Sequence, residues 1–427
     1  MMEGYLISQD KTECTGCEAC AQICPKDAIR MEEDKEKFRY PQIDKSLCIG
    51  CRLCERVCPE GNQVSFNTEK KYVFGGYSLD PKVRFESTSG GAFSAIVDAF
   101  CDNNYVIFGA KAKGLLVYHS YITDKKDLQV FRKSKYSQSI IGISYRQTRK
   151  FLNEGKKVLF SGTPCQIAGL NNFINLSKTD TTNLLTVEVI CEGVPSPLYL
   201  EKYNEFLNRK FGYDIDSIDY RFKGKSILSH GKWDFQVMKY SLKTCVGGWK
   251  GRWDFEAMRI KLKNDKTIEI DRWFNPFWSI WLKHLMSRPS CYKCPYAKQD
   301  RTADITLGDL WGVHIYCPEL YGENGGSSLI IANNKKGDEI VKKAQNEMYG
   351  HELKFEDALK YQGPIRDHIS MNSKRNECMM DLESEMTYEQ INKKWASKPT
   401  LKLLFQKYIW GNRQKVFVWN LIHSNRH

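Results

Sequence analysis

The chain has 427 residues, of which 41% are hydrophobic and 12% aromatic, so it can bury the cores of two or three globular domains. Its formal net charge is +13 and uneven: residues 1–64 carry nine Lys/Arg against twelve Asp/Glu, a balance of −3, so the remainder carries +16. No apolar run approaches the roughly 20 residues of a membrane span, and the first residues, MMEGYLISQDKTE, lack the features of a secretory signal.

The basic charge of the residues after 64 is compatible with several kinds of binding partner. It can attract an acidic partner, a phosphorylated substrate or a membrane surface, and charge contrast can help to hold an acidic N-terminal module against it. It can equally be a scattered, solvated surface. Nucleic acid is not expected as a partner, because the sequence has no recognisable reader motif and no dense basic helix.

Eight of the sixteen cysteines stand in two copies of the pattern Cys-x-x-Cys-x-x-Cys-x-x-x-Cys-Pro. This run is the signature of bacterial two-cluster ferredoxins, in which three cysteines of a loop hold one [4Fe-4S] cluster and the other loop supplies the fourth ligand. The ligands predicted for cluster one are Cys14, Cys17, Cys20 and Cys58. Those predicted for cluster two are Cys48, Cys51, Cys54 and Cys24.

The repeat extends beyond the cysteines, since Asp10, Lys11 and Gly16 recur at the same offset as Asp44, Lys45 and Gly50. Such a fixed period indicates duplication of one small unit. Zinc is the alternative, but zinc ribbons usually pair two Cys-x-x-Cys knuckles across a long gap. Because clusters need thiolates, which an oxidising compartment converts to disulfides, we expect a cytoplasmic protein.

After a polar linker at residues 60–71, strands and helices alternate. Helices are expected at 92–101, 147–155 and 199–210, and buried strands at 105–110, 157–162 and 184–191. Residues 214–275, with alternating aromatic and basic positions, suggest an antiparallel segment or insertion. We therefore predict an α/β fold (α+β overall): a ferredoxin-like two-cluster module at 1–64, an α/β domain with a mostly parallel sheet at 72–340, and a helical, basic C-terminal region at 341–427.

Three motifs lie where strands end or helices begin. Ser87-Thr88-Ser89-Gly90-Gly91 directly precedes a helix, where backbone N–H groups can bind a phosphate, although serine and threonine there are often only caps. Ser161–Gln166 follows a strand and opens a helix, an edge where α/β sheets bind ligands. Asp309 and Trp311 occupy a glycine-bounded turn after a strand. Trp311 can stack on a ring system, but a core position is the expectation.

Four further cysteines are candidates for a third cluster, namely Cys165, Cys191, Cys291 and Cys294. The first two end predicted strands, and the last two form a Cys-x-x-Cys-Pro, a spacing that suits a metal, cluster or redox pair. Buried single cysteines, however, usually behave as small hydrophobes. The remaining Cys101, Cys245, Cys317 and Cys378 have no such context and are expected to be structural.

Several sequence blocks together resemble the coenzyme F420 hydrogenase/dehydrogenase beta-subunit family of flavin and iron–sulfur proteins. The resemblance runs from about residue 74 to residue 334, and many members carry a two-cluster ferredoxin module in front, as this chain does. The blocks are STSGGAFSAI (87–96), SKYSQS (134–139), LFSGTPCQIAGL (159–170), ICEGVPSP (190–197), CYKCPYAKQDRTADITLGDLWG (291–312) and GGSSLI (325–330).

The resemblance implies FAD in the α/β domain and a further [4Fe-4S] cluster on Cys165, Cys191, Cys291 and Cys294. The residues that correspond to the flavin-contacting segments are Ser89, Gly90, Gly91, Ser134, Lys135, Tyr136, Gly162, Thr163 and Gln166. Lys135 and Tyr136 are candidates for stabilising flavin or substrate charge, or else residues of a basic surface turn. His119, His230, His284 and His314 have no pattern that identifies a general base.

The sequence therefore predicts an iron–sulfur flavoprotein oxidoreductase that exchanges electrons with a one-electron partner such as ferredoxin and acts on a small organic substrate or a deazaflavin. The alternatives are a non-catalytic electron-transfer subunit and an accessory reductase of polysaccharide biosynthesis. At the C-terminus, residues 398–427 contain six Lys/Arg, no Asp/Glu and interleaved aromatic residues. A basic aromatic helix there can contact a membrane surface, although docking on the protein's own core is favoured.

Overall fold

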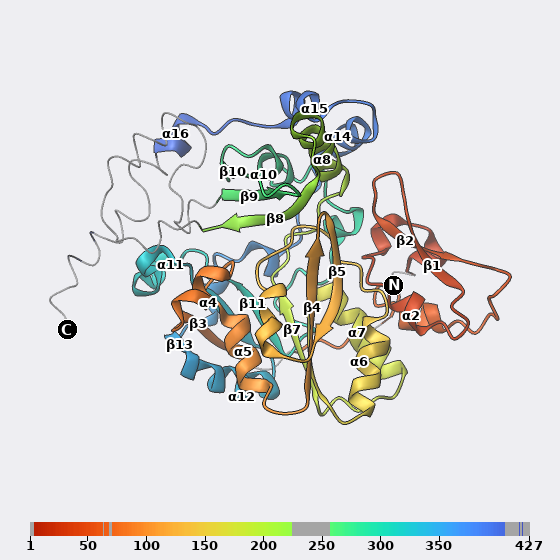
Figure 1. Ribbon diagram of the computed structural model, residues 1–427. Coiled ribbons are helices and arrows are strands. Elements are labelled where there is room, and N and C mark those ends of the chain that lie inside the picture. The colour runs from red at the N-terminus through yellow and green to blue at the C-terminus, as the bar shows by residue number, and fades with distance from the viewer. Residues whose placement is uncertain are drawn as a thin grey trace.

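The computed structural model describes residues 4–62, 64–67, 71–223 and 257–405, together with residues 418 and 421. Its largest element is an eight-stranded sheet with the order β13-β3-β12-β11-β7-β6-β4-β5 (Figure 1). In that order the strands are β13 (Met348–Glu352), β3 (Tyr72–Ser78), β12 (Ser328–Ala332), β11 (Ile305–Asp309), β7 (Leu184–Val189), β6 (Lys157–Gly162), β4 (Tyr105–Lys113) and β5 (Leu116–Ile122).

The predicted α/β fold is confirmed, with parallel strands at the centre of the sheet. β4, β6, β7 and β11 run parallel to one another. β5 on one side and β12, β3 and β13 on the other pair antiparallel. The sheet is thus less parallel than expected, because antiparallel partners extend both of its edges.

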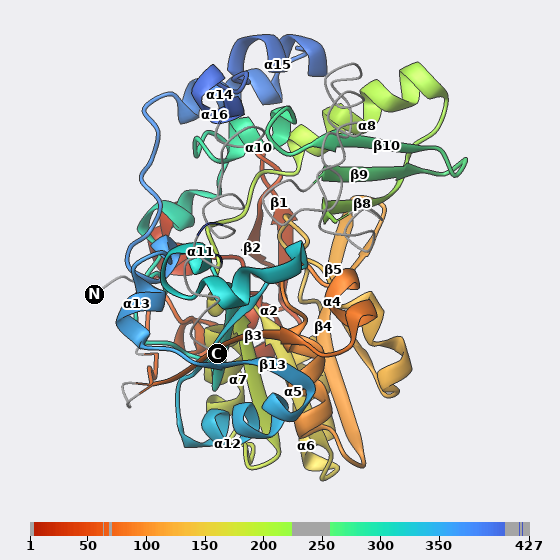
Figure 2. The ribbon, with the colours of Figure 1, turned by 90° about the vertical axis from the view of Figure 1, so that its left-hand side faces the viewer.

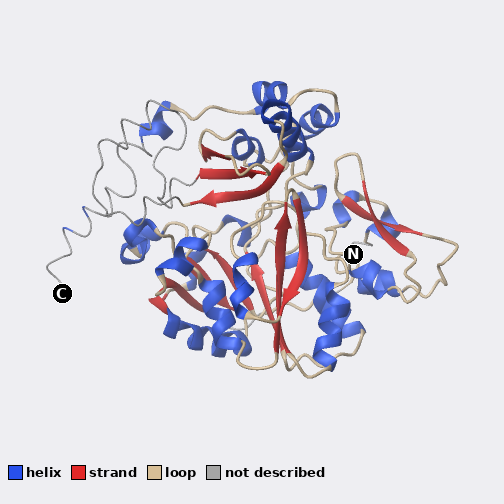
Figure 3. Cartoon of the chain, viewed as in Figure 1, coloured by secondary structure: helices blue, strands red, loops and turns tan. Residues whose placement is uncertain are grey.

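Helices cover both faces of the sheet, as the alternation of buried side chains requires. On β4 and β6, Ile107 and Leu159 face α5 (Ala92–Phe100) and α12 (Lys335–Ala344). Their neighbours Phe108 and Phe160 face α6 (Ser144–Asn153) and α7 (Pro164–Leu176) on the opposite side (Figure 3). The continuous apolar strands of the sequence therefore lie in the middle layer.

A second assembly lies beside one end of the main sheet, above it in Figures 1 and 2. It contains the antiparallel strands β8 (Ile215–Phe222), β9 (Ala257–Leu262) and β10 (Thr267–Asp271), which confirm the antiparallel prediction for the described part of 214–275. Residues 224–256, with His230 and Cys245, lie outside the described residues. The helices that share its core are α8 (Leu198–Phe211), α10 (Pro276–Trp281), α14 (Arg375–Glu383) and α15 (Tyr388–Trp395).

The cysteine-rich module contains two short helices, α2 (Ala19–Ile23) and α3 (Leu53–Val57), and the hairpin β1 (Ile29–Glu33)–β2 (Arg39–Ile43). Gly16 and Gly50, which occupy equivalent places in the repeat, both have φ of +69°, so the two cysteine loops share a left-handed turn. The duplicated sequence therefore folds into duplicated loops.

The module is packed onto α6 and α7 and does not hang from a linker. Ala19 and Val57 are fully buried in the same apolar cluster as these two helices. The Tyr145 backbone N–H donates to Gln22 Oε1 at 2.9 Å, and Arg146 Nε donates to the Gln22 carbonyl at 2.6 Å. The two halves of the chain share one core at this contact.

The shorter helices are α1 (Tyr5–Ser8), α4 (Pro81–Glu86), α11 (Val313–Tyr316), α13 (Phe355–Leu359) and α16 (Leu401–Leu404). Helices dominate after residue 337 as expected, but β13 completes the main sheet from within the segment 341–427. Most of the basic aromatic segment 398–427 lies outside the described residues. Among the described helices, none has the length and apolar character needed to cross a membrane.

We expect Gly169→Val to loosen the contact between the cysteine-rich module and α7. A Cβ atom at Gly169 would lie 3.0 Å from Cys17 Sγ and 3.1 Å from the Tyr145 hydroxyl, so valine overpacks the contact. Overpacking of this kind costs about 1–3 kcal/mol of the free energy of unfolding. Anaerobic denaturation followed by circular dichroism, with iron content per chain, measures the effect. Gly363→Ala is the control, since its Cβ would meet no atom within 4 Å.

Candidate functional site

The candidate site is a cavity of about 400 Å³ between the main sheet and the three-stranded assembly. Gly162, Val189 and Asp309 line it, and they end the parallel strands β6, β7 and β11. The carboxyl ends of parallel strands are where open α/β sheets bind ligands, because the loops there diverge and leave a crevice. The fold thus places the cavity where a ligand site is expected.

The cavity gathers two groups of residues that separate sequence motifs had indicated. Of the residues predicted to contact a flavin, those in its lining are Ser89, Gly91, Ser134, Lys135, Tyr136, Gly162, Thr163 and Gln166. All four candidate ligands of a third cluster, Cys165, Cys191, Cys291 and Cys294, also line it. The roles of both groups in binding a flavin and a cluster stay predictions. The structure shows that these segments, far apart in the sequence, line the same cavity.

Gly90 is the predicted flavin-contacting residue that the structure places elsewhere. Its backbone N–H donates to Ser328 Oγ at 2.9 Å, and a Cβ there would lie 2.5 Å from the Gly76 carbonyl oxygen. Glycine at position 90 is therefore required by the close approach of the loop to β3 and β12. Gly91, with φ of +94°, caps α5 at the cavity wall.

The turn that opens α7 is held by buried side-chain hydrogen bonds. Gln166 Oε1 accepts from the Thr163 backbone N–H at 3.0 Å, and Gln166 Nε2 donates to Ser139 Oγ at 2.9 Å. Ser139 Oγ also lies 2.9 Å from His119 Nδ1, while His119 Nε2 lies 2.9 Å from the Ser161 carbonyl. Burial lowers the pKa of His119 to about 4, so the ring is neutral at pH 7 and orders the turn.

Lys135 is positioned by the backbone, although it lines the cavity. Its ammonium donates to the carbonyls of Val130, Phe131 and Arg132 at 2.8–3.2 Å. Burial, and secondly the nearby Lys133, lower the pKa of Lys135 to about 7. Lys135 is thus a half-buried residue that caps a 3-10 turn, and its predicted role toward flavin or substrate charge stays a prediction.

Aromatic side chains form the wall on the side of the second assembly. The Tyr136 ring lies edge-on to Trp278 and Trp281, with centroids 4.7 and 5.1 Å apart. Trp311, expected in the core, is instead 36% exposed and lines the cavity, where the Arg221 guanidinium lies 5.7 Å from its ring. The glycine-bounded turn after β11 turns this side chain away from the core.

The cavity lining contains more basic than acidic side chains. The acidic residues in the described lining are Glu192, Asp309 and Asp367, whereas the basic ones are Arg132, Lys133, Lys135, Arg221, Arg272, Arg288 and Arg301. Four of the basic side chains are paired with carboxylates: Arg132 with Glu86, Lys133 with Asp219, Arg221 with Asp309 and Arg301 with Glu188. Three of these carboxylates lie outside the lining, so most of the positive charge is balanced within the protein.

The four cysteines of the cavity lie near one another although they come from three segments. Burial, and then the neighbouring Cys291 and Cys165 thiols, raise the pKa of Cys191. Burial and the neighbouring Cys294 thiol raise the pKa of Cys291 to about 12. Four thiols that oppose one another's ionisation in a buried site suit a cationic group that binds thiolates.

The N-terminal module brings its thiols together across the two loops, as the cross-liganding prediction requires. A small second cavity is lined by three of the cysteines of the first loop and by Cys58 from the other loop, which together are the four predicted for cluster one. Among the described residues, no three of the twelve candidate sulfurs lie within 4.8 Å of one another. Tetrahedral zinc with bonds of about 2.3 Å holds its sulfurs about 3.8 Å apart, so the wider spacing favours a larger cofactor.

Arg288 joins the two cysteine sites, and sequence reasoning missed it. Its side chain is 1% exposed, and Nε donates to the Cys14 carbonyl at 2.8 Å while an NH2 group lies 3.6 Å from Cys14 Sγ. The backbone carbonyl of Arg288 accepts from the Cys291 N–H at 3.0 Å. A single arginine before a Cys-x-x-Cys carries no signal, because its partners lie at the other end of the sequence.

Two family models match segments of the chain. Residues 155–357 match the family model for the carboxyl-terminal part of the coenzyme F420 hydrogenase/dehydrogenase beta subunit, and residues 13–62 match the 4Fe-4S dicluster domain. Among curated proteins, none matches the chain. A solved structure, "Xenon derivatization of the F420-reducing [NiFe] hydrogenase complex from Methanosarcina barkeri", is 15% identical with a TM-score of 0.37 and covers 76% of this chain and 91% of its own. The resemblance seen in the sequence is confirmed, and the N-terminal module is an iron–sulfur module.

We expect Arg288→Met to lower the reduction potential of the cluster predicted on Cys14. The buried guanidinium stabilises the more negative, reduced state more than the oxidised one. A hydrogen bond to a charged group contributes about 1.5–3 kcal/mol, so the difference between the two states shifts the potential by at most ~65–130 mV for one electron. Redox titration followed by EPR measures the shift. Arg288→Lys keeps the charge and should stay nearer the wild-type potential. An unchanged potential in Arg288→Met with full iron content would contradict this role.

Proposed function

Because the chain joins a 4Fe-4S dicluster domain to the C-terminal domain of the coenzyme F420 hydrogenase/dehydrogenase beta-subunit family, we propose that it is an iron–sulfur flavoprotein oxidoreductase. In this proposal FAD occupies the cavity at the ends of β6, β7 and β11. A third [4Fe-4S] cluster lies on Cys165, Cys191, Cys291 and Cys294. The substrate is a small organic compound or a deazaflavin, and the compartment is the cytoplasm.

One observation carries the proposal: the predicted flavin-contacting segments and the four cysteines line the same cavity. Cys165 is the second residue of α7, immediately after the Gly162–Thr163 turn. A ligand bound at the Gly162–Thr163 turn would therefore lie close to the Cys165 thiol. Such proximity is what electron exchange between a flavin and a cluster needs.

Several of the chain's own groups suit FAD. The backbone N–H groups at the start of α5, where Gly91 caps the helix at the cavity wall, can bind a phosphate. Aromatic rings, including Tyr136 and Trp311, offer apolar surface for a ring system. When bound, FAD supplies a centre that exchanges two electrons with a substrate and one at a time with clusters.

The second cysteine loop lies at the surface, the first loop is largely buried, and the cavity cysteines lie next to the first loop. Cys48 and Cys51 are exposed, whereas Cys17 is buried. Burial, and then the nearby Cys58, Cys14 and Cys165 thiols, raise the pKa of Cys17, so the module's first loop lies beside the cavity cysteines. This order supports a relay in which the second loop meets an external partner and the cavity cysteines serve the flavin.

Metal and flavin content of anaerobically purified protein tests the proposal. We expect about twelve irons and one FAD per chain, because three [4Fe-4S] clusters hold four irons each. Cys191→Ser should lower the iron to about eight while FAD stays bound, because it removes one ligand of the proposed third cluster. Cys378→Ser is the matched control, since Cys378 is buried in the second assembly and should leave both contents unchanged.

Two results would separate this proposal from its alternatives. About eight irons without flavin in the wild type would leave the ferredoxin module in place and favour an electron-transfer subunit. Twelve irons and FAD, with no turnover of any substrate by the single chain under a viologen reductant, would instead place the substrate site on a partner subunit.

The exposed end of the relay carries an apolar patch that fits a protein partner. Ile43, Leu47 and Ile49 are exposed around Cys48. Redox partners meet over small interfaces, where a few apolar side chains contribute much of the affinity. This patch supports a one-electron protein partner such as ferredoxin at the second cysteine loop.

We expect Ile49→Glu to slow electron exchange with reduced ferredoxin about tenfold, because burial of one isoleucine contributes more than about 1.4 kcal/mol. Stopped-flow kinetics at limiting ferredoxin measures the rate. Methyl viologen, a small reductant that needs no docking surface, should reduce both proteins equally fast. Leu79→Glu, an exposed position at the end of β3, is the control. Equal ferredoxin rates for Ile49→Glu and wild type would place docking elsewhere.

A further inference from the structure

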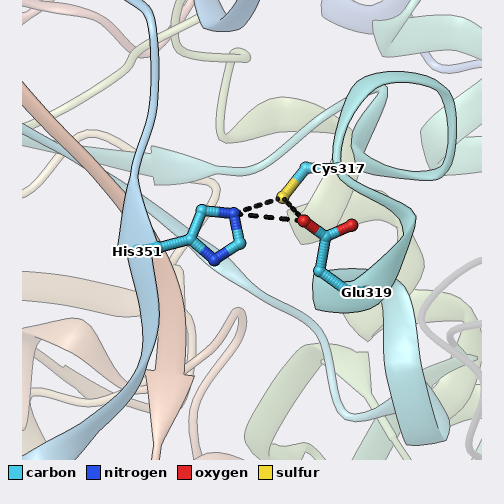
Figure 4. A group of neighbouring side chains, drawn as sticks. All are labelled: Cys317, Glu319 and His351. Carbon is cyan, nitrogen blue, oxygen red and sulfur yellow. Dashed lines mark hydrogen bonds and ion pairs between the residues drawn. The ribbon is translucent and has the colours of Figure 1, made fainter. Parts of the chain in front are cut away.

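Cys317, Glu319 and His351 form a compact group outside the cavity and the cluster loops (Figure 4). Cys317 Sγ lies 3.0 Å from His351 Nε2 and 3.3 Å from Glu319 Oε1, and the last two atoms are 3.3 Å apart. Cys317 and Glu319 lie at the start of the 3-10 helix η5 (Pro318–Asn324), and His351 lies on β13. From the sequence, Cys317 was expected to be a structural residue. Its histidine neighbour, His351, is too far away in the sequence to form a recognisable motif with it.

The arrangement differs from a catalytic relay of thiol, imidazole and carboxylate. In a relay the thiol and the carboxylate contact opposite nitrogens of the ring, so that one nitrogen takes a proton while the other is oriented. Here Cys317 and Glu319 both approach the same nitrogen, Nε2 of His351 (Figure 4). Three donor atoms that converge on one point are the arrangement of a metal site.

The three donor atoms have the spacing of one face of a coordination tetrahedron. Zinc bonds of about 2.3 Å to sulfur and about 2.0–2.2 Å to nitrogen and oxygen place tetrahedral ligands about 3.4–3.6 Å apart. The observed separations of 3.0–3.3 Å need only a small expansion to reach these values. The group therefore accommodates a cation without movement of the backbone.

Packing of the surrounding backbone holds the ligands in place independently of any cation. Leu320, fully buried, anchors η5 in a cluster with Val313, Cys317 and Leu329. His351 is fixed by its register opposite Gly75 in the pairing of β13 with β3. A Cβ at Gly75 would lie 3.1 Å from Leu320, so this glycine lets η5 approach the strands that carry the histidine. The site is thus preorganised by the fold.

We propose that Cys317, Glu319 and His351 bind a divalent cation of the zinc class. One thiolate, one imidazole and one carboxylate form a borderline donor set that suits Zn²⁺, whereas Mg²⁺ and Ca²⁺ prefer oxygen ligands alone. Cys317 is 1% exposed, and Glu319 and His351 are each 44% exposed in their side chains, so a fourth position faces solvent. Binding converts the Cys317 thiol to a zinc thiolate and releases its proton to water.

The cation clamps η5 to the edge strand β13. Through the short helix α11, η5 is continuous with the turn that carries Trp311, and the Tyr316 hydroxyl donates to the Trp311 carbonyl at 3.3 Å. Trp311 lines the cavity of the proposed flavin site. The proposed cation therefore has a structural role at the side of that site and takes no part in electron transfer.

Zinc analysis of the full chain, purified anaerobically with its iron–sulfur clusters, tests the site. Protein equilibrated with zinc alone and then desalted should retain about one zinc per chain, with one sulfur and nitrogen or oxygen ligands by X-ray absorption spectroscopy at the zinc edge. His351→Gln and Glu319→Gln should reduce retained zinc at least tenfold. Their side chains are partly exposed, so folding should persist, and unchanged iron content and circular dichroism verify it. Cys317→Ser should remove the sulfur ligand.

Cys101→Ser is the matched control, because Cys101 is buried in the main core and should leave zinc retention unchanged. No retained zinc in the wild type would overturn the proposal. Equal retention in wild type and His351→Gln, or a zinc site with four sulfur ligands, would also overturn it, because the zinc would then occupy the cluster loops. These outcomes do not depend on flavin content, so they are separable from the test of the proposed function.

Discussion

Helix α7 packs against the N-terminal cysteine-rich module and also opens the cavity. It therefore sets the distance between the cysteines of the module and those of the cavity. Its first turn carries Cys165 at the cavity, and one turn later Gly169 lets Cys17 of the module pack against the helix backbone. Farther along, the Asn172 side-chain amide donates to the Val57 carbonyl at 3.3 Å. Both cysteine loops are thus held by the helix that opens the cavity, so single-electron exchange between them does not rely on a mobile linker.

Features set by local spacing could be predicted from the sequence. The two cysteine loops and the strand–turn–helix edge at Gly162 depend on residues within one or two turns of each other, whereas the left-handed turns at Gly16 and Gly50 are a finding of the structure. Buried central strands were also predictable, because β6 and β7 are continuous apolar runs whose composition suits a sheet covered on both faces. The antiparallel edge formed by β12, β3 and β13 was not, because it depends on which distant segment reaches the sheet. The other edge is local, since β5 follows β4 directly and pairs with it as a hairpin.

Contacts between distant segments could not be predicted in the same way. Arg288 contacts Cys14 from the other end of the sequence, and nothing in its local sequence distinguishes it from a surface arginine. Trp311 was expected in the core because a lone tryptophan usually packs there, yet the turn after β11 directs it to the cavity wall. Gly90 matched a flavin-contacting motif; its absent side chain allows the loop to pack on β3 and β12, and its contact with a flavin stays a prediction. For Arg288 and Trp311, tertiary packing decides between two interpretations that the local sequence leaves equal.

The acidic module and the basic remainder of the chain contact each other through buried arginine side chains. Charge contrast between an acidic module and a basic body would be weak if it acted only through solvent, because exposed ion pairs contribute little. Here Arg375, 4% exposed, donates from NH1 to Glu36 of the module at 2.8 Å, and buried Arg288 contacts Cys14. Guanidinium groups at such contacts stay charged at every physiological pH and offer several fixed donors, so they orient their partners. A cluster on the predicted ligands would add negative charge beside Arg288, and each electron added would increase it. Arg288 would then hold Cys14 most strongly in the reduced state, whereas Arg375 pairs with Glu36 in either state.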